Sequence, residues 1–228
     1  MKLPGVFIGV IIACSVMAAA ELESARDRQD RAALEKSVAE LQAVAQKKPS
    51  DADAHYRVAL AYSYLAEVSL EQRDKNAAKR AAESGIRAAE RAIALKPGTA
   101  EYHRILGTLC GQVIPANVLA GFSYGKRAQE SIAKALELDP KSARAYLSRG
   151  VGNYYLPAAL GGGLDAAIRD FQKAATLDPK PDEAYLWLGL ALRKANRNAE
   201  ARQALSRSLQ INPKRGWTQQ QLEKTPAR

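Results

Sequence analysis

The chain has 228 residues, of which 47% are apolar and 25% are charged, and its formal net charge at pH 7 is +10. This length and apolar content suffice for a sizeable core, in one domain or in a short array of repeats, and they exclude a disordered or fibrous chain. With only two cysteines, at positions 14 and 110, stability must come from packing rather than from a disulfide framework.

The first 20 residues have the pattern of an export signal, with one early lysine, a short apolar run and a small-residue exit at Ala18 and Ala20. We expect cleavage before Glu21 and a protein that is exported to the bacterial periplasm. In a rival interpretation, residues 11–14 resemble the bacterial lipobox, and Cys14 is lipidated and becomes the mature N-terminus. An uncleaved anchor is disfavoured, because the apolar run is shorter than the roughly 20 residues that span a bilayer.

The rest of the chain has a periodic organisation that is marked by prolines. Residues 21–49 are predicted to form a single helix that closes at a proline, and four more helical segments end at prolines with spacings of 48, 43, 39 and 34 residues. These prolines are Pro49, Pro97, Pro140, Pro179 and Pro213. Since a proline cannot donate the next backbone hydrogen bond, each is expected to end a helix.

The last of these segments contains the clearest pattern. Residues 182–213 carry, in order, Tyr185, Leu188, Gly189 and Leu192, and then Ala201, Leu205, Ser208 and Pro213. This order of aromatic, large apolar and small residues resembles the tetratricopeptide repeat, a unit of about 34 residues. The resemblance implies an all-α solenoid of antiparallel helix pairs, in which Gly189 and Ala201 stand where the two helices approach closely.

The same marks recur upstream with wider spacing, and the extra 14, 9 and 5 residues fall between the two helices of the first three units. We therefore expect a capping helix in residues 21–49, four units within residues 50–213 and a C-terminal capping segment in residues 214–228. The four units are predicted to span residues 52–97, 100–140, 143–179 and 182–213.

The glycine-rich stretch LPAALGGG, residues 156–163, lies between the two helices of the third unit. A phosphate-binding loop would need a preceding strand, and a lysine with a serine or threonine after the last glycine. Leu164 and Asp165 follow here instead, and an acidic residue in the first helical turn would repel a phosphate. This pattern favours a wide turn.

No residue pattern indicates catalysis or a cofactor. The two histidines, His55 and His103, stand at the aromatic position of a first helix, without cysteine or acidic residues at metal-ligand spacing. Cys110 lies in an apolar helical stretch and is predicted to be a buried structural thiol. We expect no metal, no cofactor and no enzymatic activity.

The resemblance also implies a binding face, because in tetratricopeptide repeat proteins positions two, five, nine, twelve and thirteen of each first helix line the concave side. The resulting candidate groove is rich in tyrosine and has few charges. It consists of Tyr56, Leu60, Tyr64, Arg104, Thr108, Leu147, Val151, Tyr154, Tyr155, Leu186 and Leu190.

Such a groove suits a peptide of an envelope protein, either as an amphipathic helix or in extended form. Tyr56 and Leu60 stand where members that grip a C-terminal carboxylate have Lys and Asn, which disfavours chaperone-tail binding. The alternative is a carrier or sensor of a lipid or another apolar molecule. Residues 111–127 are predicted to cover the groove, or else to extend the two helices of their unit.

Two narrower resemblances bear on the ligand. Residues 161–179, with the insertion-bearing units, are similar to the regulator-of-microtubule-dynamics group, of which some members hold lipid. The exported location and irregular array are similar to the repeat component of tripartite periplasmic transporters.

The C-terminal end is markedly basic, with nine Lys or Arg against two Glu in residues 193–228. It is predicted to meet an anionic membrane surface or an acidic partner, or to be a solvated polar cap. Nucleic acid is not expected, because aromatic residues do not interleave the charges. The sequence as a whole predicts a noncatalytic exported scaffold.

Overall fold

The structure is a computed structural model that describes residues 20–116 and 121–227. The predicted export signal, with Cys14 and Ala18, lies outside the described residues apart from Ala20. Within them the chain is helical and has no β-strand, so the predicted all-α solenoid is confirmed. None of the described helices is long and apolar enough to cross a membrane.

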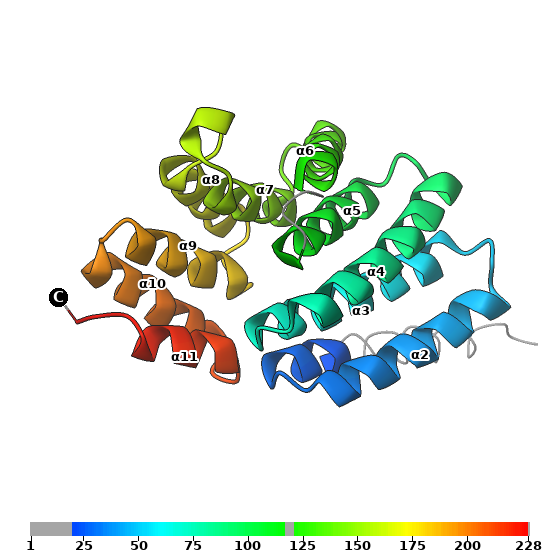
Figure 1. The fold of residues 1–228 in the computed structure, drawn as a ribbon, viewed down its shortest axis with the longest axis horizontal. Helices are drawn as coiled ribbons and strands as arrows, with labels where there is room; N and C mark the ends of the chain where they lie inside the picture. The colour runs from blue at the N-terminus through cyan, green and yellow to red at the C-terminus, as the bar shows by residue number, and fades with distance from the viewer. Residues whose placement is uncertain (1–19, 117–120, 228) are drawn as a thin grey trace, which may run out of the picture.

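Helical residues 20–27 precede a run of helices that pair in chain order (Figure 1). The pairs are α3 with α4, α5 with α6, α7 with α8, and α9 with α10. The helix bounds are α2 Arg31–Lys47, α3 Ala52–Glu71, α4 Lys75–Leu95, α5 Ala100–Val113, α6 Gly121–Leu138, α7 Ala143–Tyr155, α8 Leu164–Leu177, α9 Glu183–Lys194, α10 Asn198–Ile211 and α11 Gly216–Glu223. Two short 3₁₀ turns interrupt the connections, η1 Ile114–Ala116 and η2 Ala158–Leu160.

The recurring prolines set the ends of the helices. Helices α2, α4, α6, α8 and α10 each end two residues before a proline. A proline ring disfavours the helical conformation of the residue before it. Accordingly, Lys96 has φ −142° and ψ 80°, and Asn212 has φ −130° and ψ 86°. Asp51 and Asp74 stabilise the starts of α3 and α4, where their side chains accept hydrogen bonds from backbone N–H groups.

The prediction of one helix over residues 21–49 is wrong. The chain turns between residue 27 and α2, and Gln29 has a φ of +56°. The side chain of Asp30 then caps α2 by accepting a hydrogen bond from the backbone N–H of Ala33. Because an N-cap aspartate competes with helix continuation, Asp30 divides the segment in two.

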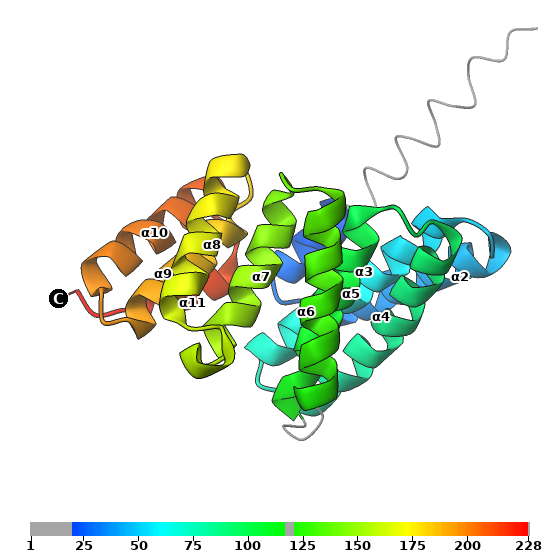
Figure 2. The same ribbon diagram turned by 90° about the horizontal axis from the view of Figure 1, so that it is seen from above.

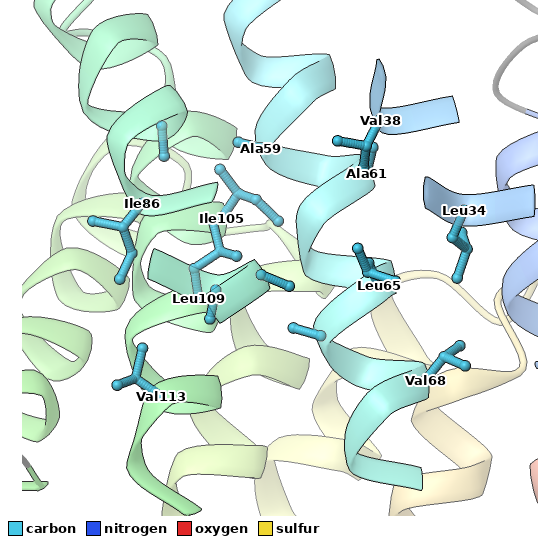
Figure 3. Close-up of a cluster of buried hydrophobic side chains, with 14 of the residues drawn as sticks. Leu34, Val38, Ala59, Ala61, Leu65, Val68, Ile86, Ile105, Leu109 and Val113 are labelled. Carbon is cyan, nitrogen blue, oxygen red and sulfur yellow. The ribbon is translucent and has the colours of Figure 1, made fainter. Parts of the chain in front are cut away.

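The largest apolar cluster joins α2, α3, α4 and α5 and also includes Leu22 and Ala25 from residues 20–27 (Figure 3). Alanines allow the helices to approach closely, and Ile105 and Leu109 fill the space between them with almost no exposed surface. A second cluster on α8, α9 and α10 centres on Phe171. Each cluster therefore joins one helix pair to helices of the next, as expected of a repeat array.

The glycine-rich stretch is a turn, as predicted. Gly161 and Gly163 have φ values of +87° and +101°, which side-chain-bearing residues rarely adopt. The N–H of Gly163 donates hydrogen bonds to the carbonyls of Asn153 and Leu156, at 2.9 and 2.8 Å. The amide that would hold a phosphate is therefore already used within the turn.

The described part of the 111–127 insertion does not support its prediction as a cover of the groove. Residues 111–113 extend α5, residues 121–127 begin α6, and η1 packs against α4, α5 and α6. Residues 117–120 lie outside the described residues. The described residues thus lengthen their own helix pair, which is the alternative that the sequence left open.

Two glycines of α7 test the close approach of paired helices. A Cβ atom on Gly150 would lie 2.5 Å from Cε1 of the buried Phe171, whereas a Cβ atom on Gly152 would meet nothing within 4 Å. We expect Gly150→Ala to lower the free energy of unfolding by about 1–3 kcal/mol through overpacking. Gly152→Ala should raise it by about 0.5–1 kcal/mol, because alanine is the better helix former.

Urea unfolding followed by circular dichroism measures both changes. An unchanged stability of Gly150→Ala would contradict the close packing of α7 on α8.

Candidate binding surface

The eleven residues of the candidate groove lie on the first helices α3, α5, α7 and α9, and each of these helices contacts the next. They are not equally accessible. Arg104, Leu186 and Leu190 are buried, and Tyr155 is exposed. Tyr56, Leu60, Tyr64, Thr108, Leu147, Val151 and Tyr154 are half-buried. The predicted residues therefore lie on neighbouring helices, but they do not line one open groove, because several of them are buried.

The centre of the groove is polar, unlike the expected surface with few charges. The hydroxyl of Tyr56 donates a hydrogen bond to Glu101 at 2.8 Å, and Arg104 forms an ion pair with the same carboxylate at 2.7 Å. Burial, followed by the charge of Glu101, raises the pKa of Tyr56 to about 12. Thr108 and Ser148 hydrogen-bond to each other at 3.0 Å. Most polar groups here are paired within the protein.

One end of the groove is covered by residues 21–29, which we call the N-terminal clasp. Its residues Leu22, Ala25, Arg26 and Asp27 are buried. The Arg26 guanidinium lies over the ring of Tyr64, 4.8 Å from its centroid, and burial raises the pKa of that tyrosine. The clasp was predicted only as part of a capping helix.

The clasp also joins the first units to the last. Arg26 forms an ion pair with Glu183 at the start of α9, and the Asn212 amide donates a hydrogen bond to Asp27 at 2.8 Å. Arg215 is fully buried and pairs with Asp27 at 3.4 Å and with Glu71, at the end of α3, at 2.8 Å. These contacts close the array into a ring, with residues 20–27 beside α11 (Figures 1 and 2).

We call this set the closure network. Its members are Arg26, Asp27, Glu67, Glu71, Glu183, Asn212 and Arg215.

Carboxylates outnumber arginines in the closure network. Burial raises the pKa of Glu71 to about 7; Arg215 opposes this rise and the neighbouring Glu67 adds to it. Burial alone would raise the pKa of Glu183. The positive charges of Arg26 and Arg215 have the larger combined effect, and the pKa of that carboxyl is lowered. Glu71 is thus the member of the network that is expected to titrate near neutral pH.

The other end of the groove is aromatic. Ring centroids of Tyr154 and Tyr155 are 4.9 Å apart, and Trp187 lies 5.7 Å from Tyr154 and 5.7 Å from Trp217. Lys194 lies over the Tyr154 ring at 4.3 Å. We call Tyr154, Tyr155, Trp187 and Trp217 the aromatic cluster.

Tyr155 is 66% exposed, so this cluster presents apolar surface to solvent. The positional rule found its two tyrosines. It missed both tryptophans, because Trp187 falls between two groove positions and Trp217 lies beyond the repeats.

The histidines have a structural role. His55 and His103 hydrogen-bond through Nε2 to the carbonyls of Pro49 and Pro97, each six residues earlier, at 3.1 and 2.7 Å. Gln219 makes the same bond to Pro213 at 2.9 Å. The described residues contain no group of three His, Cys, Asp or Glu side chains that could hold a metal ion. Cys110 is buried, and burial raises the pKa of its thiol to about 11.

Part of the basic C-terminal charge holds the chain end in place. Arg193 donates to the carbonyl of Gln221, and Arg202 donates to the carbonyls of Leu222 and Thr225. The charge of Arg215 is already paired with carboxylates of the closure network. The basic surface is therefore smaller than the residue count suggests.

Comparison with known proteins identifies the family. The sequence model for regulator of microtubule dynamics protein 1-3 matches residues 16–156. The chain belongs to this family. Residues 161–215 of this family member also match a sequence model of the tetratricopeptide repeat. The resemblances to the tetratricopeptide repeat and to the regulator-of-microtubule-dynamics group are thereby confirmed, although the family match covers residues 16–156 and not the stretch 161–179 on which the second resemblance was based. The resemblance to the repeat component of tripartite periplasmic transporters stays a prediction.

A curated relative is the small glutamine-rich tetratricopeptide repeat-containing protein 2 of Mycosarcoma maydis, 34% identical over 90 residues. The match covers 40% of this chain, and this chain spans about a quarter (24%) of that relative's length.

Two solved structures share the fold. The thermophilic tetratricopeptide repeat protein TTC0263 of Thermus thermophilus is 18% identical, with a TM-score of 0.63 over 85% of this chain and 90% of that one. The haemophore HusA of Porphyromonas gingivalis is 20% identical, with a TM-score of 0.62 over 86% and 96%. Tetratricopeptide repeat proteins are in general noncatalytic scaffolds that bind proteins or peptides, and the regulator of microtubule dynamics family member shares their fold.

The titration of Glu71 predicts how stability depends on pH. Its folded pKa of about 7 lies above the ordinary value of 4.5, so the folded state binds the proton more tightly than the unfolded state does. The stabilisation is complete below about pH 4.5 and is lost as the pH rises through 7. We expect the free energy of unfolding to fall by about 1–3 kcal/mol between pH 5 and pH 8 from this group.

Urea unfolding of the wild type and of Glu71→Gln across this range isolates the effect, because the glutamine cannot titrate. Glu35→Gln, at an exposed site on α2, is the control and should keep the wild-type profile. Identical pH profiles for Glu71→Gln and wild type would contradict the assignment.

Proposed function

We propose that the chain is an exported, noncatalytic scaffold that binds a polypeptide segment of an envelope protein through the aromatic cluster. The observation that carries the proposal is the 66% exposure of Tyr155 beside Tyr154 and Trp187. Tyrosine and tryptophan offer large contact areas at little conformational cost and are enriched at the centres of protein interfaces. The exposed ring of Tyr155 continues the half-buried rings of Tyr154 and Trp187 to the surface, and this arrangement supports a role in binding.

Charge defines the partner further. Lys194 is exposed at the end of α9, next to the aromatic cluster, and Lys214 and Lys224 are exposed near α11. The positive charge of these lysines would attract an acidic residue in the bound segment, mainly by raising the association rate. The preferred segment therefore combines apolar side chains with Asp or Glu. The same lysines disfavour a basic partner.

The proposed location rests on the first 20 residues. A lysine, an apolar run and the Ala18 to Ala20 exit support export to the periplasm, with lipidation at Cys14 as the alternative. Mass spectrometry of the purified mature protein distinguishes an N-terminus at Glu21 from a lipidated one at Cys14.

The second candidate is carriage of a lipid or another apolar molecule. Its support is the fold shared with HusA, which is named a haemophore. Two hollows of the described residues are small for such a ligand. One beside Leu147 measures about 10 Å³, and one of about 210 Å³ lies away from the groove, between α2, α3 and α4. Enclosed ligand sites usually measure roughly 300–1,000 Å³.

Site-specific photocrosslinking tests the proposal. A benzoylphenylalanine at position 155 should crosslink to one discrete envelope protein, whereas the same residue at position 44 should not. Val44 is a matched control, because it is 44% exposed but lies on α2, away from the aromatic cluster. The crosslinked segment is then synthesised and titrated against the purified chain. Native mass spectra that show an extractable lipid, with no crosslink from position 155, would overturn the proposal in favour of the carrier.

The titration has a built-in reporter, because both tryptophans of the chain belong to the aromatic cluster. We expect Tyr155→Ala to weaken binding of the synthesised segment at least tenfold, about 1.4 kcal/mol, as measured by tryptophan fluorescence. Its free energy of unfolding should stay within about 0.5 kcal/mol of wild type, since the side chain is exposed. Unchanged affinity would remove Tyr155 from the site.

A further inference from the structure

The N-terminal clasp has two chemically different faces. Leu22 and Ala25 are 4% and 2% exposed and belong to the apolar cluster of α2 to α5. Arg26 and Asp27 face the other half of the ring. The clasp is thus an amphipathic segment that lies between the two halves of the array.

The contacts of the clasp with the last units are polar. Arg26 pairs with Glu183, and Asp27 accepts from Asn212 and pairs with Arg215. The Gln220 amide donates to Gln29 at 3.0 Å. No apolar cluster of the described residues combines the clasp with α7 to α11. Removing one partner of a buried ion pair is costly, whereas replacing the pair by equally well-matched groups can be neutral. The clasp can therefore exchange with a segment that supplies an arginine to Glu183 and a carboxylate to Arg215 in the same places.

The surface beneath the clasp continues the binding face. Tyr64, covered by Arg26, is one of the predicted groove residues, and Glu183 is the first residue of α9, the helix that also carries Trp187. Removal of the clasp would uncover the part of the α2 to α5 apolar cluster that packs against Leu22 and Ala25, which we call the apolar strip, together with the carboxylate of Glu183. An amphipathic helix with a small apolar face and one arginine fits this surface, as the clasp itself does.

We propose that the surface under residues 21–29 is a docking site for a helix of the partner protein, and that the clasp occupies it as an internal competitor. The partner helix would present Leu and Ala to the apolar strip and an arginine to Glu183. The inference rests on the proposed function, since it takes the ligand to be a polypeptide.

A peptide of residues 21–30, ELESARDRQD, labelled with fluorescein, tests the competition on the full chain by fluorescence anisotropy. The wild type should bind it weakly, because its own clasp fills the site. Arg26→Glu places a carboxylate against Glu183 and should release the clasp, so that this variant binds the peptide at least tenfold more tightly. The double variant Arg26→Glu with Glu183→Arg restores the pair in reverse and should return to weak binding.

Two controls define the site. The peptide with Glu in place of Arg26 should not bind the Arg26→Glu chain, and Glu35→Gln, at an exposed residue of α2 outside the clasp, should behave as wild type. If Arg26→Glu does not fold by circular dichroism, Ala25→Asp releases the clasp from its apolar face instead and leaves the site intact.

Equal peptide affinity of wild type and a folded released variant, or no binding by either, would overturn the inference. Crosslinking from position 155 is unaffected by that outcome, so the proposed function is judged separately.

Discussion

The position of one arginine constrains the whole molecule. Arg215 lies in the turn between α10 and α11 with no exposed surface, and a buried guanidinium is tolerated only where carboxylates surround it. Glu67 and Glu71 come from α3 and Asp27 from the clasp. Because α3 and the clasp lie at the first end of the array and Arg215 lies at the last, pairing this charge requires the solenoid to close on itself. An open superhelix of the same units would leave Arg215 unpaired.

Closure divides the concave side into three parts. The clasp covers the part around Tyr64, the network of Glu101 and Arg104 fills the centre with paired polar groups, and the aromatic cluster remains accessible at the far end. The accessible part is the one that combines exposed tyrosine with a neighbouring lysine. The binding role that we propose therefore concentrates on α7, α9 and α11, and the covered part becomes available only if the clasp moves.

The sequence predicted the fold well because its signals are local. A proline two residues past each second helix, and small residues such as Gly150 and Gly189 at close approaches, act within one repeat. Closure could not be predicted in this way. Arg26 and Glu183 are 157 residues apart, and no periodic pattern relates them. The break before α2 had a local signal in Asp30. Burial of Arg104 and pairing at the groove centre depend on side chains from neighbouring units, which the position rule does not consider.

Closure of the ring through Arg215 is the central claim, and a distance measurement between its two sides tests it most directly. Spin labels at the exposed residues Ala32 on α2 and Gln219 on α11 can be followed by double electron–electron resonance. We expect one narrow distance distribution for the otherwise wild-type chain, and a broader distribution at longer distances after Arg215→Met. A broad distribution before the substitution, or an unchanged narrow one after it, would contradict the closed ring.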